Sequence, residues 1–277
     1  MFPSEKLDPA DAAIFEMFVV PRYLSLFGEL ALEMLISGPE ARLLHVGSRT
    51  GYPDLKLYER IESAEILGLD ASEAALALAR QRAGALGGAS IEYRLAESLP
   101  GDLDPGVFTH ALCLHPVVTN HERAELFSAL RWLLCPGGQA LVALPLRGSF
   151  QELTDLLREY ALKFDDADFS RELEAGLAER PTLEMLSDEL EQAGFDDIDV
   201  EIRQVTLPFD SGRAFAEDPV SRLLIVPEVR RWLAIEDITP ALEYVRDAMD
   251  KYWSESKLEL ALNVGCASAR EPSRHDQ

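Results

Sequence analysis

The stretch ARLLHVGSRTG, Ala41 to Gly51, decides how the rest of the chain is interpreted. Residues 42–46 are mostly apolar and predict a short buried strand. The next five residues, Gly47-Ser48-Arg49-Thr50-Gly51, predict a tight glycine turn. We expect a helix over residues 53–61, because Pro53 suits a first helical turn, where a missing N–H needs no partner. A strand, a glycine turn and a helix N-terminus in this order form a cradle for a small ligand.

Short apolar runs continue to alternate with helical patterns after this cradle. We expect strands over residues 65–69, 91–95, 110–115 and 139–144. Asp70 follows the first of these runs, and Ser72 is the expected N-cap of an alanine-rich helix that stops at Gly87-Gly88. A helix is expected over 121–134, followed by a turn at Pro136-Gly137-Gly138. The alternation predicts an α/β fold with a doubly wound parallel sheet, whose ligands bind at the carboxyl ends of the strands.

The flanking regions predict additional helices and two further strands. Residues 11–37 have helical spacing that Pro21 should split in two, and residues 153–160 and 182–193 predict helices. Residues 163–180 are charged and ambiguous. Strands are expected over 199–207 and 257–266. Between 209 and 256 we expect helix in two pieces, the second with Thr239 as its cap and Pro240 as its first residue. The expected organisation is a helical cap (1–40), a core (41–207), a helical insertion or lid (208–256), a last core strand (257–269) and a flexible tail (270–277).

The composition indicates a well-solvated acidic protein. The net charge is −23 in 277 residues, and the part from Ser149 onward holds 30 acidic and 14 basic side chains. Such a surface disfavours direct nucleic-acid binding, and its acidic C-terminal half is a possible surface for a protein partner. No signal peptide or membrane-spanning stretch is evident, so we expect a cytoplasmic protein with no membrane contact. Cys113, Cys135 and Cys266 lack metal-ligand spacing, so no metal site is expected.

Several segments in order resemble the class I S-adenosylmethionine-dependent methyltransferases of the UbiE/BioC-like kind. The matching segments are FEMFVVPRYL, LLHVGSRTG, ILGLDAS, RLAESLP, FTHALCLHPVV, LRWLLCPGGQALVALP and EQAGFDDIDVEI. The resemblance covers roughly residues 12–205. It implies a Rossmann-like sheet of seven strands in which the last, residues 257–266, runs antiparallel. It also implies in-line transfer of a methyl group to a small-molecule acceptor, which leaves S-adenosylhomocysteine.

The resemblance implies where S-adenosylmethionine binds. The glycine turn, with Gly47, Ser48 and Gly51, would approach the methionine moiety. Asp70, followed by Ala71, would take the ribose hydroxyls, and Glu97 would take the adenine amine. A helix-capping role is the alternative for Asp70.

Four residues depart from the family pattern. The family usually has an acidic residue at the position of His45, glycine at that of Arg49, an acidic residue at that of Leu95 and aspartate at that of Thr109. His45 and Arg49 together make the turn more positive by two charges. The cofactor has a net charge of +1, and two like charges about 4 Å apart repel by about 4 kcal/mol at an effective dielectric constant of about 20. A catalytically inactive binding or scaffold protein is therefore the alternative function, and a cationic pocket for an anionic ligand is a variant of it.

The acceptor side is less clearly marked. His115 and His121 are weak candidates for a catalytic base, with capping or surface roles as the alternative. Tyr23, Phe209, Trp232 and Trp253 lie in segments that often cover the acceptor in this family, although core packing is the simpler interpretation. A nicotinamide-dependent oxidoreductase is disfavoured, because GSRTGY has two glycines where that fingerprint needs three.

Overall fold

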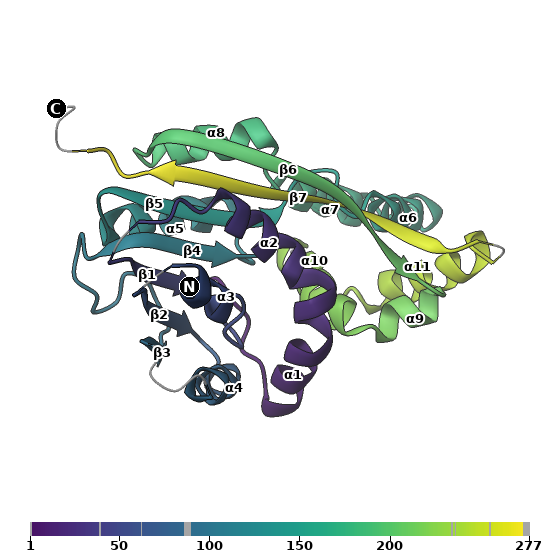
Figure 1. Ribbon diagram of the computed structural model, residues 1–277. Helices are drawn as coiled ribbons and strands as arrows, with labels where there is room; N and C mark the ends of the chain where they lie inside the picture. The colour runs from purple at the N-terminus through teal and green to yellow at the C-terminus, as the bar shows by residue number, and fades with distance from the viewer. Residues whose placement is uncertain are drawn as a thin grey trace. The chain divides into compact units, whose positions relative to one another are not determined.

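The core of the computed structural model is a twisted sheet with helices against it (Figure 1). The structure describes residues 2–38, 40–61, 63–85, 90–233, 235, 237–254 and 256–273. Among these, seven strands form one sheet in the order β3-β2-β1-β4-β5-β7-β6. The strands are β1 (Arg42–Val46), β2 (Glu65–Asp70), β3 (Ile91–Leu95), β4 (Phe108–Leu114), β5 (Leu134–Pro145), β6 (Asp196–Phe209) and β7 (Leu258–Arg270).

The first five strands are parallel, as the sequence predicts. β1 lies between β2 and β4, with Leu44 opposite Leu67 on one side and Ala111 on the other. The last strand is antiparallel to β5, because Gly137 and Gly138 exchange hydrogen bonds with Glu271 while Leu146 N donates to Asn263 O. The strand order reverses between β1 and β4, so the carboxyl ends of these strands, together with that of β2, form the edge where this fold places ligands.

The helices are α1 (Pro9–Ile14), η1 (Phe15–Leu24), α2 (Ser25–Met34), α3 (Asp54–Arg60), α4 (Glu73–Gly84), α5 (Asn120–Leu133), α6 (Gln151–Lys163), α7 (Ala167–Ala178), α8 (Leu183–Gln192), α9 (Gly212–Glu217), η2 (Ser221–Ile225), α10 (Val226–Trp232) and α11 (Thr239–Tyr252). Ser72 caps α4 as predicted, with its hydroxyl accepting from Ala75 N. Helix α4 already ends at Gly84, and the predicted stop at Gly87-Gly88 lies outside the described residues.

Several predicted boundaries are wrong. Pro21 does not split the N-terminal helix: residues 15–24 adopt a π-helical hydrogen-bond pattern, whose wider turns accommodate a residue without an N–H. The predicted turn at residues 136–138 is an irregularity inside β5, where the register jumps from Phe108–Leu134 to His110–Gln139. The described residues of the region 209–256 form three helical stretches rather than two. Thr239 is the first residue of α11 rather than its cap, and its N–H donates to the Asp237 carboxylate.

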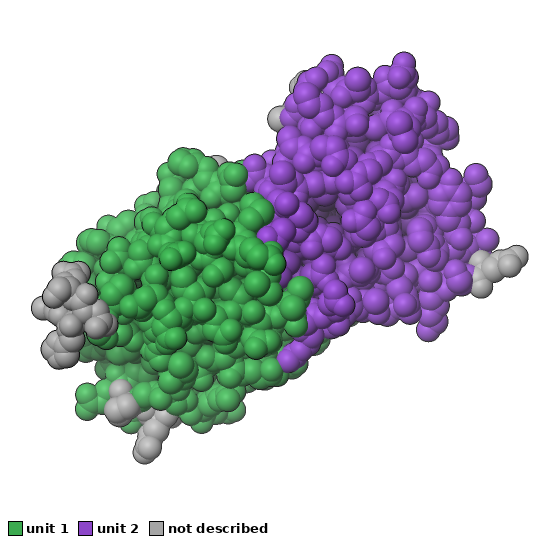
Figure 2. Space-filling view, turned by 90° about the horizontal axis from the view of Figure 1, so that it is seen from above, with its two compact units in different colours: residues 1–144, 183–202, 265–277 green, residues 145–182, 203–264 purple. Residues whose placement is uncertain are grey.

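The chain forms two compact units, coloured separately in Figure 2. Unit 1 comprises residues 1–144, 183–202 and 265–277, and unit 2 comprises residues 145–182 and 203–264. Both long strands β6 and β7 contribute residues to each unit. The domain boundaries expected from the sequence stay a prediction, as does the flexible tail, of which residues 274–277 are outside the description.

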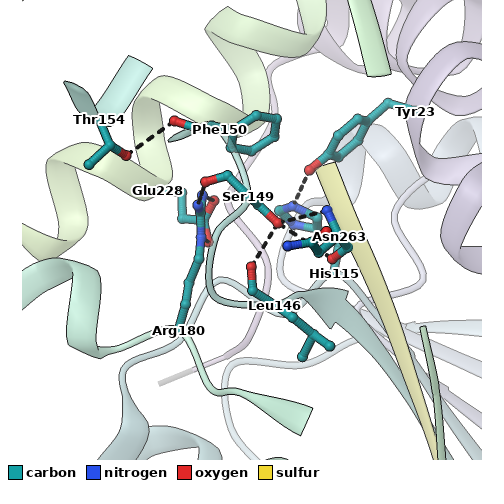
Figure 3. Close-up of polar contacts among 9 residues, drawn as sticks. All are labelled: Tyr23, His115, Leu146, Ser149, Phe150, Thr154, Arg180, Glu228 and Asn263. Atoms are coloured by element: carbon teal, nitrogen blue, oxygen red, sulfur yellow. Dashed lines mark hydrogen bonds and ion pairs between the residues drawn. The ribbon is translucent and has the colours of Figure 1, made fainter. Parts of the chain in front are cut away.

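Unit 2 is organised around a buried ion pair. The guanidinium of Arg180 donates to both carboxylate oxygens of Glu228, at 2.8 and 3.3 Å, and to Ser149 O at 2.7 Å (Figure 3). The same group lies over the rings of Trp232 and Phe150. These contacts connect α10 to the segments before α6 and α8, which explains how a charged pair is tolerated in the interior.

Candidate functional site

The glycine turn after β1 folds back onto the end of β2. The amides of Gly47 and Ser48 both donate to Leu69 O at 2.9 Å, and the amide of Arg49 donates to Asp70 Oδ2 at 3.0 Å. Gly47 has φ +71° and Arg49 φ +46°. The left-handed conformation suits the glycine, whereas it is strained for an arginine. The Gly51 amide also donates, to Ser48 O at 2.8 Å, so the turn has the predicted geometry but four of its amides are bonded within the protein.

Asp70 ends β2 and is fully buried. Its Oδ1 accepts from the amide of Ser72 at 2.8 Å. Its Oδ2 accepts from the Arg49 amide and from the hydroxyl of Ser4, the latter at 2.7 Å. The carboxylate therefore lies at the carboxyl end of β2, as predicted, and its role in ribose binding stays a prediction.

The side chain of Arg49 lies inside the protein, with 3% of its surface exposed. Its guanidinium donates to Leu114 O and His115 O, both at 2.9 Å, and more weakly to Gly47 O at 3.4 Å. Its guanidinium carbon is 5.7 Å from the centre of the Phe15 ring. Burial lowers the pKa of Arg49, while the nearby Asp70 charge acts in the opposite direction. The cation thus bridges the carboxyl ends of β1 and β4.

His45, which stands where the family usually has an acid, belongs to a buried polar cluster. Its Nδ1 lies 2.7 Å from Asp54 Oδ1, and the hydroxyl of Tyr93 donates to Asp54 Oδ2 at 2.9 Å. The Tyr93 ring packs against two glycines, since a Cβ on Gly51 would meet the Tyr93 hydroxyl at 2.5 Å and a Cβ on Gly68 would meet Cδ1 at 2.4 Å. Gly51 is therefore needed for packing. A Cβ on Gly47 would approach the Ser4 Cβ at 3.6 Å, an ordinary van der Waals distance, so space alone does not require glycine there.

Buried polar atoms of the turn leave hydrogen-bonding capacity unused. Ser48 Oγ, Thr50 Oγ1 and His45 Nε2 are buried and make no hydrogen bond within the described residues. Most buried polar atoms in proteins have a partner, so these three atoms are exceptions. The Asp70 carboxylate, which already accepts a hydrogen bond from a hydroxyl, fits the hydroxyl groups of a ligand such as S-adenosylmethionine in kind. Arg49 does not fit it, because a buried cation repels a cationic ligand.

The structure separates the remaining predicted positions. Ala71 follows Asp70 and is buried, whereas Leu95, at the end of β3, is 53% exposed. Glu97 is also exposed and forms an ion pair with Lys6 at 3.2 Å. Thr109 lies in β4, where its hydroxyl joins β1 through Arg42 N and Arg42 O. Thr109 therefore has a structural role away from the carboxyl edge.

His115 lies immediately after β4 and is fully buried. Its Nε2 is 2.9 Å from the hydroxyl of Tyr23 (Figure 3). Its ring packs edge-on against Phe27. His115 has a φ of +49°, and its backbone oxygen accepts a hydrogen bond from the Arg49 guanidinium. Arg49 and His115 are therefore both in strained backbone conformations. His121 is on the surface beside Glu125, with 82% of its side chain exposed, so the structure does not bring the two histidines together.

The aromatic candidates take packing positions within their own units. Tyr23 and Phe209 are buried, and Phe209 packs edge-on against Phe215. Trp232 stacks on Arg180, and Trp253 packs against Tyr252.

Burial raises the pKa of the Cys113 thiol to about 12, which keeps it protonated near neutral pH. The described residues contain no cluster of histidine, cysteine, aspartate and glutamate suited to a metal ion.

Two features of the site are missed by the sequence interpretation. The first is Ser4, which precedes every predicted element, and the second is the pair of backbone oxygens at the end of β4 that hold the Arg49 guanidinium inside the protein. The sequence marks Arg49 as unusual by its place in a glycine turn, but a side chain in a turn normally points to solvent. Nothing in MFPSEKLD, residues 1–8, has a periodic pattern that would place this segment over Asp70.

The comparisons with known proteins agree with this architecture. Residues 43–138 match the sequence model of a family described as "Methyltransferase domain". No curated protein matches the sequence.

Three of the similar solved structures cover about nine-tenths of this chain. A protein of Bacillus halodurans C-125 is 17% identical with a TM-score of 0.57, and 89% of this chain and 99% of that one are covered. The [4+2]-cyclase SpnF is 18% identical with a TM-score of 0.53, covering 90% and 81%. The phosphoethanolamine N-methyltransferase 2 of Haemonchus contortus, in complex with phosphomonomethylethanolamine and S-adenosylhomocysteine, is 18% identical with a TM-score of 0.53, covering 89% and 52%. This chain thus spans about half the length of the Haemonchus protein.

At these identities the structural matches concern the fold, and the presence of a cyclase among them shows that the fold serves more than one reaction. No helix in the described part of the chain is long and apolar enough to cross a membrane. The chain has the class I methyltransferase fold, and its residues 43–138 match the methyltransferase-domain family.

Proposed function

We propose that this protein is an S-adenosylmethionine-dependent methyltransferase that acts on a small-molecule acceptor. The observation that carries the proposal is Asp70, a fully buried carboxylate at the carboxyl end of β2, directly beside the glycine turn. Asp70 lies within residues 43–138, which match the methyltransferase-domain family model. A structural neighbour crystallised with S-adenosylhomocysteine adds support at the level of the fold.

The proposed cofactor would supply a methyl group activated by a positively charged sulfur. Asp70 would accept hydrogen bonds from the ribose hydroxyls, because its Oδ2 already accepts one from a serine hydroxyl. Gly47, Ser48 and Ala71 would border the cofactor, and Glu97 would turn from Lys6 toward the adenine amine. Gly51 would act indirectly, because its missing Cβ makes room for Tyr93.

His115 is the better placed of the two histidine candidates for the acceptor side. It follows β4 at the same edge as Asp70, and its backbone oxygen is held by Arg49. A hydrogen-bonded imidazole can accept the proton that an oxygen or nitrogen acceptor loses. His121, exposed on the surface, would have no part in the reaction.

The proposal is tested with S-adenosylmethionine tritiated in its methyl group. The protein is incubated with this donor and a fractionated metabolite extract, and radioactivity is followed into small molecules and into protein. We expect label in a small-molecule fraction, lost in Asp70→Asn and retained in Asp104→Asn, which alters an exposed aspartate of the β3–β4 loop. Label in no fraction from protein that binds S-adenosylmethionine, or equal label with Asp70→Asn, would refute the proposal.

A non-catalytic binding or scaffold protein is the second candidate. It is favoured by the closed state of the site, because Ser4, Ser72 and Arg49 satisfy Asp70 and the guanidinium is buried. The acidic C-terminal half would then be the partner surface. Absence of S-adenosylmethionine binding in every variant described below would favour this candidate. A cytoplasmic location stays a prediction for either function.

A further inference from the structure

Residues 2–7, which we call the N-terminal strap, lie across the carboxyl edge of the sheet. Pro3 O accepts from the amide of Val117, which follows β4, at 3.0 Å. Leu7 O accepts from the hydroxyl of Ser72, which follows β2, at 2.8 Å. Phe2, Pro3 and Ser4 are buried. The strap therefore reaches from one strand end to another across the point where the strand order reverses.

The strap contacts the positions that are predicted to hold the cofactor. Ser4 donates to Asp70, Lys6 pairs with Glu97, and Leu7 binds the residue after Ala71. The Cβ of Ser4 is also the nearest atom to the open side of Gly47. One short segment thus covers the residues that are predicted to bind the ribose, the adenine and the methionine moiety of the cofactor.

The chemistry of these contacts matches that of the proposed cofactor. A hydroxyl donates to the carboxylate expected to bind ribose, and an ammonium group donates to the carboxylate expected to bind the adenine amine. Phe2 and Pro3 are buried and anchor the start of the strap, whereas the Lys6–Glu97 pair is exposed to solvent. Glu5 and Lys6 are exposed and Leu7 is half-buried, and a segment with little buried surface can open locally at a smaller free-energy change than global unfolding.

We propose that the N-terminal strap is an internal competitor for the cofactor site, so that S-adenosylmethionine binds only after the strap is displaced. This inference rests on the proposed function. An equilibrium between closed and open strap lowers the apparent affinity by the fraction of open molecules. If the strap is closed in about 90 to 99% of molecules, its removal tightens binding by about 10- to 100-fold. Arg49 is a separate obstacle, because it belongs to the turn and stays when the strap leaves.

The test compares S-adenosylmethionine binding by calorimetry in four forms of the full chain. These are the wild type, a variant without residues 2–7, Ser4→Asp and Ser128→Asp. Ser4→Asp places a second carboxylate against Asp70 and should open the strap by repulsion without shortening the chain. Ser128→Asp, on the exposed side of α5, is the matched control. We expect the variant without residues 2–7 and the Ser4→Asp variant to bind S-adenosylmethionine at least about 10-fold more tightly than the wild type and the control.

Limited proteolysis gives a readout that does not depend on activity. Lys6 is exposed, so opening of the strap should speed tryptic cleavage after it. In the wild type, S-adenosylmethionine should accelerate this cleavage, whereas a ligand that binds beside a closed strap would leave it unchanged.

The outcomes separate the two proposals. Equal affinity in all four forms, or binding without faster cleavage after Lys6, would overturn the strap inference and leave the proposed function intact. No binding in any form, including Arg49→Gly in the background without residues 2–7, would overturn the proposed function, and the strap inference with it.

Discussion

Replacing Arg49 by glycine should change the preference of the site between two related ligands. The substitution removes a buried guanidinium from the ends of β1 and β4 and leaves a residue that adopts φ +46° without strain. S-adenosylmethionine carries a positive sulfur, whereas S-adenosylhomocysteine carries a neutral thioether. The two ligands are otherwise nearly the same size, so a difference between their changes in affinity reports the effect of charge rather than of volume.

The magnitude follows from Coulomb's law. Two positive charges about 6 Å apart repel by about 3 kcal/mol at an effective dielectric constant of about 20, which is about 100-fold in Kd. Arg49 is 3% exposed, so solvent screens it weakly. Asp70 attracts the ligand equally in both proteins and cancels in the comparison. We therefore expect Arg49→Gly to tighten S-adenosylmethionine by about 10- to 100-fold more than S-adenosylhomocysteine.

Calorimetric titration of both ligands into both proteins measures this difference. The background without residues 2–7 is used, so that the strap does not mask the effect. An equal gain for the two ligands would mean that Arg49 obstructs by volume and would refute the electrostatic reasoning. No gain for either ligand would show that Arg49 is not an obstacle.

Further predictions concern stability and are checked by urea or thermal unfolding. Gly68→Ala should destabilise the fold by about 1–3 kcal/mol, because the new Cβ would meet the Tyr93 ring at 2.4 Å. Arg180→Ala should cost about 3–5 kcal/mol by leaving the Glu228 carboxylate buried without its partner, and Glu228→Gln in the same chain should restore part of this. Burial lowers the pKa of His110, so the unfolded chain binds the proton more readily. Stability should therefore fall as the pH drops below about 6.5, by at most about 1.4 kcal/mol per pH unit, and His110→Gln should flatten this dependence.

The sheet is predictable from the sequence because its strands leave local patterns. The apolar run of residues 42–46 and the run that ends at Asp70 coincide with β1 and β2. Ser72 caps α4 for the same reason, since capping depends on a residue and its near neighbours. The place of Asp70 at the sheet edge follows directly from these two elements.

The closed state of the site is not predictable in this way. The Ser4–Asp70 hydrogen bond joins residues 66 positions apart, and no periodic pattern marks such a contact. The inward direction of Arg49 depends on the Leu114 and His115 oxygens, which another strand supplies. The irregularity at residues 136–138 has turn chemistry, and only its pairing with β4 shows that it lies within a strand. Tertiary contacts thus decide what local propensity leaves open.

The central claim is that Asp70 and the glycine turn form an S-adenosylmethionine site that the chain itself closes. Calorimetric titration of S-adenosylmethionine into Arg49→Gly without residues 2–7 tests it most directly. We predict one-to-one binding that is markedly tighter than in the wild type and is lost on adding Asp70→Asn. No binding by the opened protein, or binding that Asp70→Asn leaves unchanged, would contradict the claim.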